Sequence, residues 1–145
     1  KLNGLGLRKK AVFKVYVGGL YLEAPSSDAA AILAADAPKA LRMHFLRSID
    51  RAKLVETFQE GFVANAGAKA AAEKANVDRL LATVADVKDG SVTTYTYVPG
   101  TGTVVNRDGK DVATIPGKAF ADVLFSLWLG PKPPSEDLQK GLLGR

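Results

Sequence analysis

The sequence contains no cysteine, and this absence excludes disulfide bonds, thiolate metal sites and cysteine nucleophiles together. Histidine is almost as scarce, because His44 stands alone and one imidazole cannot build a histidine metal site. The chain also lacks any run of about 18 apolar residues, so we expect no transmembrane segment. We therefore expect neither a metal nor another cofactor.

The charged residues lack the arrangement that nucleic-acid binding requires. The chain has 20 Lys and Arg residues against 15 Asp and Glu, but they are scattered, and the longest basic run is Arg8-Lys9-Lys10. Aromatic residues do not alternate with basic ones in a stacking pattern. We expect a well-solvated basic surface and no nucleic-acid partner.

Length and composition predict one ordinary domain. The 145 residues can bury a sizeable core, and an apolar fraction of 47% with 24% charged residues is typical of a globular protein. We find no repeat or internal linker, so residues 1–145 are predicted to form a single domain. The chain begins at Lys1 without Met, inside a segment predicted to be structured. We expect upstream residues to have been cleaved or omitted, with a targeting segment as one candidate.

The most informative segment is the opening one, residues 3–23. Two early glycines suit a turn that leads into a strand, and Arg8 follows at the junction. The two-residue repeat then places Tyr16 on one face of a long strand. Gly18-Gly19 removes one side chain from each face, which indicates a bend, a bulge or the close approach of another group. Arg8 and Tyr16 predict a polar corner on an apolar floor; the alternative is a plain buried strand with an exposed arginine.

Periodicity and turn residues divide the rest of the chain into further elements. We expect helices over 26–35, 50–64, 68–87, 120–128 and after Ser135, and strands over 40–46, 91–98, 103–106 and 112–115. This order predicts an α+β domain whose antiparallel sheet is covered on one face by helices. Such a layer readily leaves an apolar cleft between sheet and helices.

Three side chains in the middle of the chain are candidates for function. Phe58 and Phe62 fall at helical spacing, which predicts either plain core or the roof of an apolar pocket. His44 alternates on the strand over 40–46 and has no carboxylate or hydroxyl partner at a recognisable spacing. We expect it to be a strand residue with one hydrogen bond and not a general base.

Segments at both ends of the chain resemble the bacterial chalcone isomerase-like proteins. They are NGLGLRKK at 3–10, VYVGGLYLE at 15–23 and WLGPKPPSEDLQKGLLG at 128–144. The wider superfamily includes plant chalcone isomerases and fatty-acid-binding proteins of the same fold. The resemblance implies an open-faced β-sandwich over residues 2–144, with helices backing a large antiparallel sheet and a ligand cleft between them. It also implies export to the periplasm.

The resemblance gives the polar corner a role. In the family, the arginine after G-x-G-x, here Arg8, meets the anionic group of the ligand. A tyrosine at the position of Tyr16 helps fatty-acid binders to hold the carboxylate, whereas the plant isomerases have a threonine there. The isomerases also use a tyrosine, a lysine and an asparagine that correspond to Asp50, Lys53 and Thr57, so only the lysine is retained.

These departures favour binding over catalysis. Ring closure of a chalcone needs a held phenolate and donors on the developing enolate. A carboxylate ligand needs only a charge-assisted contact, a phenol and an apolar tunnel. We expect non-catalytic binding of a fatty acid or similar amphipathic carboxylate. The alternatives are a weak or divergent isomerase that acts on a phenolic anion with Arg8 and Lys53, and an interaction module without a small ligand.

The predicted ligand site thus combines a polar head-group contact with apolar walls. Its residues are Arg8, Tyr16, Gly18, Phe58, Phe62, Phe120 and Leu124, and Trp128 belongs to the same apolar stripe as the last two.

Overall fold

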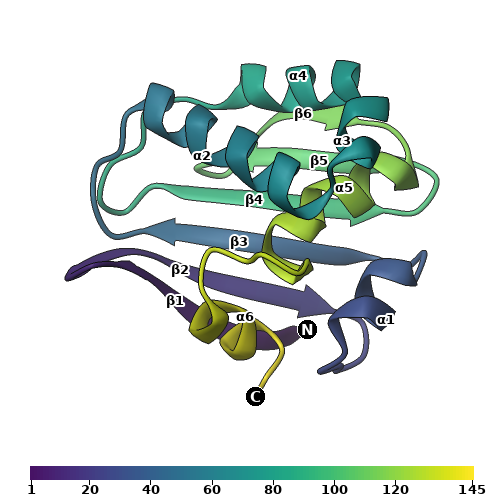
Figure 1. Ribbon diagram of the computed structural model, residues 1–145, viewed down its shortest axis with the longest axis horizontal. Helices are drawn as coiled ribbons and strands as arrows, with labels where there is room; N and C mark the ends of the chain where they lie inside the picture. Colours follow the sequence, from purple (N-terminus) through teal and green to yellow (C-terminus); the bar gives the residue numbers. More distant parts are fainter.

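A six-stranded antiparallel sheet organises the computed structural model, which describes residues 1–145 (Figure 1). The strands are β1 (Leu2–Lys10), β2 (Phe13–Leu22), β3 (Lys39–Phe45), β4 (Val92–Val98), β5 (Gly102–Arg107) and β6 (Lys110–Ile115). Their order in the sheet is the order in the chain, so each strand pairs with its sequence neighbours. The predicted α+β class with an antiparallel sheet is confirmed.

Helices cover one face of this sheet (Figure 1). They are α1 (Ala29–Ala34), α2 (Arg51–Asn65), α3 (Ala68–Ala72), α4 (Lys74–Thr83), α5 (Lys118–Leu129) and α6 (Glu136–Leu142). No helix combines the length and the apolar character that crossing a membrane requires. A sheet with one covered and one open face is the open-faced β-sandwich that the family resemblance implies.

The opening segment is a hairpin, and the predicted turn followed by one long strand is wrong. β1 pairs with β2 so that Gly6 lies opposite Gly18 and Arg8 lies opposite Tyr16. The chain reverses at Ala11, which has a φ of 55°. Glycine or asparagine usually occupies such a left-handed position, so an alanine there carries no hairpin signal in the sequence.

Close packing against α6 accounts for Gly18 of the glycine pair in β2, whereas a Cβ at Gly19 would meet the side chains of Leu5 and Tyr21 on the other face. A Cβ at Gly18 would lie 3.3 Å from Leu138 Cδ1, and one at Gly6 would lie 2.5 Å from the Leu138 carbonyl oxygen. Gly141 of α6 lies equally close to the backbone of β1. The β1–β2 register runs through Gly18-Gly19 without a bulge. Of the predicted alternatives, the close approach is confirmed at Gly18, where the approaching group is α6.

Two helix boundaries differ from the sequence prediction. Ser26 and Ser27 are predicted by residue type to cap the first helix, but the N-cap of α1 is Asp28, whose side chain accepts a hydrogen bond from the Ala31 N–H. The residue types predict that the helix over 68–87 is interrupted, if at all, at Asn76 or Asp78, but the break lies at Glu73 and the helix ends at Thr83. Ala72, Glu73 and Lys74 all favour helix, so no local signal marks an interruption at Glu73. Packing of α3 against α5 and α2 accompanies it.

The core lies between the covered face of the sheet and α5. Leu41, Met43 and Phe45 of β3 point into it, as their alternation predicts. α5 buries nine of its twelve residues and is therefore covered on nearly every side. The end of α5 that lies nearest α2 forms part of the site described next.

Candidate functional site

A cavity of about 620 Å³ opens between β1–β3, α2 and the C-terminal end of α5. Its volume falls within the range of roughly 300–1,000 Å³ that is usual for small-ligand sites. The apolar walls come from residues that include Val15, Met43, Phe45, Ile49, Leu54, Phe58, Leu127 and Trp128. Exposed polar residues form the rim, among them Lys10, Arg47, Asp50, Lys53, Glu60 and Lys132. The cavity thus has a polar entrance and a largely apolar interior.

Arg8 brings a positive charge into this cavity from β1. It is half-buried and lies next to the β-bulge between Arg8 and Lys9. Its Nη1 donates a hydrogen bond of 2.6 Å to the Pro134 carbonyl oxygen, which holds the guanidinium in place. The ion pairs of the protein involve other residues, so no carboxylate neutralises this arginine. The remaining donors of Arg8 are available to an anionic ligand.

Tyr16 places a phenol beside that charge. It lies opposite Arg8 in the β1–β2 pair and is only 8% exposed. Its hydroxyl oxygen accepts a hydrogen bond of 3.0 Å from Trp128 Nε1 and donates none to the protein. Burial raises the pKa of Tyr16 to about 12, although the Trp128 hydrogen bond and the charge of Arg8 act in the opposite direction. Tyr16 is therefore a neutral hydrogen-bond donor at neutral pH, which suits a carboxylate.

Aromatic contacts hold the walls of the cavity in position. Phe45 meets the edge of Tyr16 with ring centroids 5.7 Å apart. Phe58 of α2 makes edge contacts of 6.4 Å with both Trp128 and Tyr95. Edge-to-face pairs of this kind add to the free energy of burial and fix ring orientation. The apolar interior is thus formed before any ligand enters.

Some of the residues predicted from sequence meet at this cavity. Arg8, Tyr16, Phe58 and Trp128 all line it, as does Lys53, the residue expected for the isomerase alternative. Their contact with a ligand stays a prediction. The other two positions aligned with isomerase residues also line the cavity, namely Asp50 and Thr57.

Those two positions do not supply the isomerase groups. Thr57 Oγ1 donates to the Lys53 carbonyl oxygen of its own helix at 2.9 Å, and Lys53 Nζ lies 3.6 Å from Glu56 Oε1. Asp50 begins α2 without a side-chain capping bond and is exposed. The α2 wall therefore presents a carboxylate and a lysine, and no phenol or amide.

The other four predicted site residues do not line the cavity. Gly18 lies beneath α6, and Phe62 packs on Phe58 within the core. Phe120 and Leu124 are 0% exposed and belong to the preceding turns of α5. Because α5 is apolar on nearly every side, its periodicity could not show which of its turns borders a cavity.

Several lining residues were not predicted as site residues from sequence. Met43 and Phe45 stand on the same face of β3 as Leu41, and β3 pairs with β2 so that Phe45 lies opposite Tyr16. The alternation over 40–46 was visible in the sequence, but the pairing register that brings this face to Tyr16 was not. Arg47 and Phe13 at the rim carried no recognisable signal.

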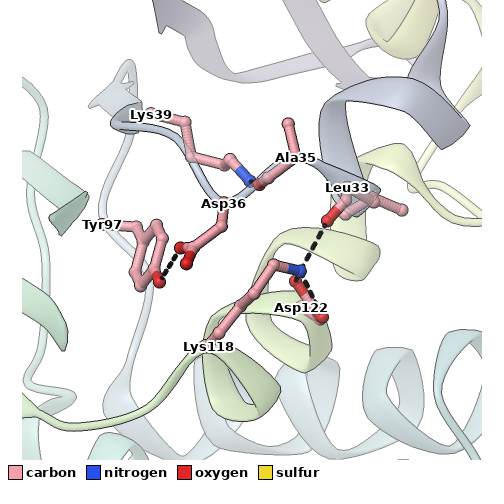
Figure 2. Close-up of polar contacts among 7 residues, drawn as sticks. All are labelled: Leu33, Ala35, Asp36, Lys39, Tyr97, Lys118 and Asp122. Carbon is pink, nitrogen blue, oxygen red and sulfur yellow. Dashed lines mark hydrogen bonds and ion pairs between the residues drawn. The ribbon is translucent and has the colours of Figure 1, made fainter. Parts of the chain in front are cut away.

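A second polar cluster lies at the opposite end of β3 (Figure 2). The Tyr97 hydroxyl donates a hydrogen bond of 2.5 Å to Asp36 Oδ1. Lys39 Nζ donates to the Ala35 carbonyl oxygen at 2.9 Å and lies 5.5 Å from the centroid of the Tyr97 ring. Nearby, Lys118 Nζ pairs with Asp122 at 3.0 Å. The cluster joins α1, β3, β4 and α5.

This second cluster, called the closed cluster below, satisfies its polar groups internally and lies apart from the cavity. Lys39 is only 4% exposed, and neither Lys39 nor Tyr97 lines the 620 Å³ cavity. The hydrogen bond to Asp36, with burial, raises the pKa of Tyr97 to about 12. Burial lowers the pKa of Lys39. The cluster pairs its polar groups with one another and with backbone carbonyl groups, so its cations already have partners.

Comparisons with known proteins agree with this architecture. The model of a family described as chalcone isomerase-like matches residues 1–144. Among solved structures, a crystal structure of a fatty-acid binding protein from Arabidopsis thaliana is similar, with a TM-score of 0.73 and 18% sequence identity. The match covers 99% of this chain and 86% of that chain. At this identity the likeness shows the fold alone. A comparison with curated proteins found no match.

Proposed function

This chain belongs to the chalcone isomerase-like family, and from that premise we propose that it binds a fatty acid or similar amphipathic carboxylate without transforming it. One observation carries the proposal: the unpaired Arg8 guanidinium lies beside a neutral Tyr16 hydroxyl in a largely apolar cavity of about 620 Å³. The name of the similar structure, a fatty-acid binding protein, supports the same ligand class.

The head group would bind at Arg8 and Tyr16. A carboxylate presents two acceptor oxygens, which match the free donors of a guanidinium and one phenol. Hydrogen bonds to charged groups typically contribute about 1.5–3 kcal/mol. Because Pro134 already holds Nη1 of Arg8, little side-chain freedom would be lost on binding.

The hydrocarbon tail would bind against the aromatic and aliphatic walls. Burial of each methylene contributes about 0.8 kcal/mol, so affinity should increase with chain length until the cavity is full. Phe45, Phe58 and Trp128 are held by aromatic contacts and would present this surface without rearrangement.

An isomerase is the less favoured function. Lys53 lines the cavity, but Asp50 and Thr57 stand where an isomerase has a tyrosine and an asparagine, and Thr57 bonds to its own helix. Few donors therefore remain for a developing enolate. A phenolic anion could still bind at Arg8 without being turned over.

Calorimetric titration of the full chain with matched acids and alcohols tests the proposal. We expect affinity to increase from octanoate to myristate, and decanoate to bind about tenfold or more tightly than decanol. Equal affinity for decanoate and decanol would contradict the head-group contact. No binding at any chain length would contradict the function. Loss of chalcone absorbance that depends on Arg8 would establish the isomerase instead.

A further inference from the structure

The β1–β2 hairpin ends in a tip, residues 9–14, that presents apolar side chains to solvent. Val12 is 83% exposed and Phe13 is 54% exposed. Figure 1 shows the turn at one extreme of the molecule, at the left of the view and away from α1. Adjacent exposed apolar residues at a protruding turn make it a candidate interaction site.

The same tip is strongly cationic. Lys9, Lys10 and Lys14 flank the turn and are exposed, and the Arg47 guanidinium lies 4.3 Å from the centroid of the Phe13 ring. None of these cations belongs to an ion pair. Residues 1–22 include five Lys and Arg residues and no Asp or Glu, so this segment alone carries as much charge as the net +5 of the chain.

We propose that the hairpin tip docks on an anionic lipid surface. Apolar and aromatic side chains favour the boundary between headgroups and acyl chains, and lysines beside them are attracted to anionic headgroups. A nucleic acid would satisfy the lysines, but it gives no reason for an 83% exposed valine at the extreme of the turn. The combination of Val12 and Phe13 with unpaired cations therefore favours a bilayer.

Docking at this tip would bring the cavity to the membrane. Lys10, Phe13 and Arg47 belong to the tip or contact it, and all three also line the cavity. Amphipathic carboxylates partition into bilayers, so the cavity entrance would face the phase that holds them. This consequence rests on the proposed function, whereas the docking itself does not.

Vesicle flotation with the full chain tests the docking. We expect binding to vesicles of phosphatidylcholine mixed with phosphatidylglycerol, little binding to phosphatidylcholine alone, and a steady decrease with added salt. The double variant Lys9→Glu/Val12→Ser should lose about tenfold or more in partitioning, since each cation near an anionic surface contributes about 1 kcal/mol. Both residues are exposed and lie outside the cavity lining.

The matched control makes the same changes elsewhere. Lys110→Glu/Val63→Ser alters the charge equally and replaces a valine that is 76% exposed on α2, so it should partition within about twofold of the wild type. Equal losses in the two variants, equal binding to neutral vesicles, or binding of a DNA oligonucleotide in place of vesicles would overturn the proposal. We expect the tip variant to bind decanoate with unchanged affinity, because its two substitutions lie outside the cavity lining. A loss of vesicle binding in this variant would then be a loss of docking and not of ligand binding.

Discussion

Two cross-strand pairs on the covered face of the sheet each place a tyrosine beside a cation, but only one of them borders a cavity. Arg8 lies opposite Tyr16, and Lys39 lies opposite Tyr97. At the second pair, the protein supplies its own anion, because Asp36 accepts the Tyr97 hydrogen bond. At the first pair there is no carboxylate. The Arg8–Tyr16 pair is therefore the candidate binding site, because the protein supplies no anion to it and the adjacent cavity has space for an anionic ligand.

The difference also shows how each pair is held. Packing of α1 and α5 closes the Lys39 end, and all its polar groups bond within the cluster (Figure 2). At the Arg8 end, α6 packs tightly on β1, while Trp128 holds the Tyr16 hydroxyl from above. Hydrogen bonds hold Arg8 and Tyr16 beside a cavity that no side chain fills, which suits a preformed ligand site.

The largest effect is expected from disrupting the packing of α6 on β1, the strand that carries Arg8. Gly6→Val would place side-chain carbons where the Leu138 backbone lies, at 2.5 Å from a Cβ. We expect a loss of about 3 kcal/mol or more in the free energy of unfolding, measured by urea denaturation. Thr96→Val on the open face of β4 is the control and should change stability by less than about 1 kcal/mol. Equal stability of the Gly6 variant would contradict the tight α6 contact.

Removing the Arg8 cation should weaken ligand binding at the cavity. Arg8→Ala should weaken binding of decanoate by about 10–100-fold, since a charge-assisted contact is lost. Arg42→Ala, which removes an exposed arginine from the open face of the sheet, should change affinity less than about twofold. Calorimetry measures both. Similar losses in the two variants would show that only overall charge attracts the ligand.

Removing the Tyr97 hydroxyl should lower stability without changing ligand affinity, whereas removing the Tyr16 hydroxyl should lower ligand affinity. Tyr97→Phe leaves Asp36 without its partner and should lower the free energy of unfolding by about 1–3 kcal/mol, with decanoate affinity unchanged. Tyr16→Phe should weaken decanoate binding by about three- to tenfold. Denaturation and calorimetry of both variants provide the check. A loss of affinity in Tyr97→Phe would mean that the closed cluster participates in binding.

The smallest effect concerns alkaline pH. The pKa of Tyr97 is raised to about 12 in the folded protein from an ordinary value of 10.0, so folding favours the protonated phenol. Its contribution to stability is complete below pH 10 and is lost as the pH rises to about 12. Tyr97→Phe should therefore lose less stability over this range than the wild type does, although Tyr16 contributes a similar dependence. Parallel pH profiles of the two proteins would contradict the Asp36 hydrogen bond.

Sequence patterns predicted the elements that depend on local alternation. The faces of β3, the apolar stripe of α2 and the cap of α6 by Ser135 all follow from nearest neighbours along the chain. The hairpin at Ala11 was not predicted, because its turn contains no glycine or asparagine. Arg8 and Tyr16 were predicted as partners, and the β1–β2 register confirms that they lie opposite each other.

The rest depends on contacts between distant segments. The pairing of Lys39 with Tyr97 follows only from the β3–β4 register, so the closed cluster was invisible in the sequence. Phe120 and Leu124 were expected at the ligand, but the cavity borders only the last turn of α5, at Leu127 and Trp128. Which turn of a fully apolar helix meets a cavity is decided by the elements packed around it.

A crystal structure of the protein with a terminally brominated fatty acid tests the central claim most directly. The account predicts the carboxylate within hydrogen-bonding distance of the Arg8 guanidinium and the Tyr16 hydroxyl, with the bromine signal among the apolar walls near Phe58. A carboxylate at Lys53 or Lys132 on the rim, with the bromine beside Arg8, would contradict it. So would a cavity that stays free of the fatty acid at saturating concentration.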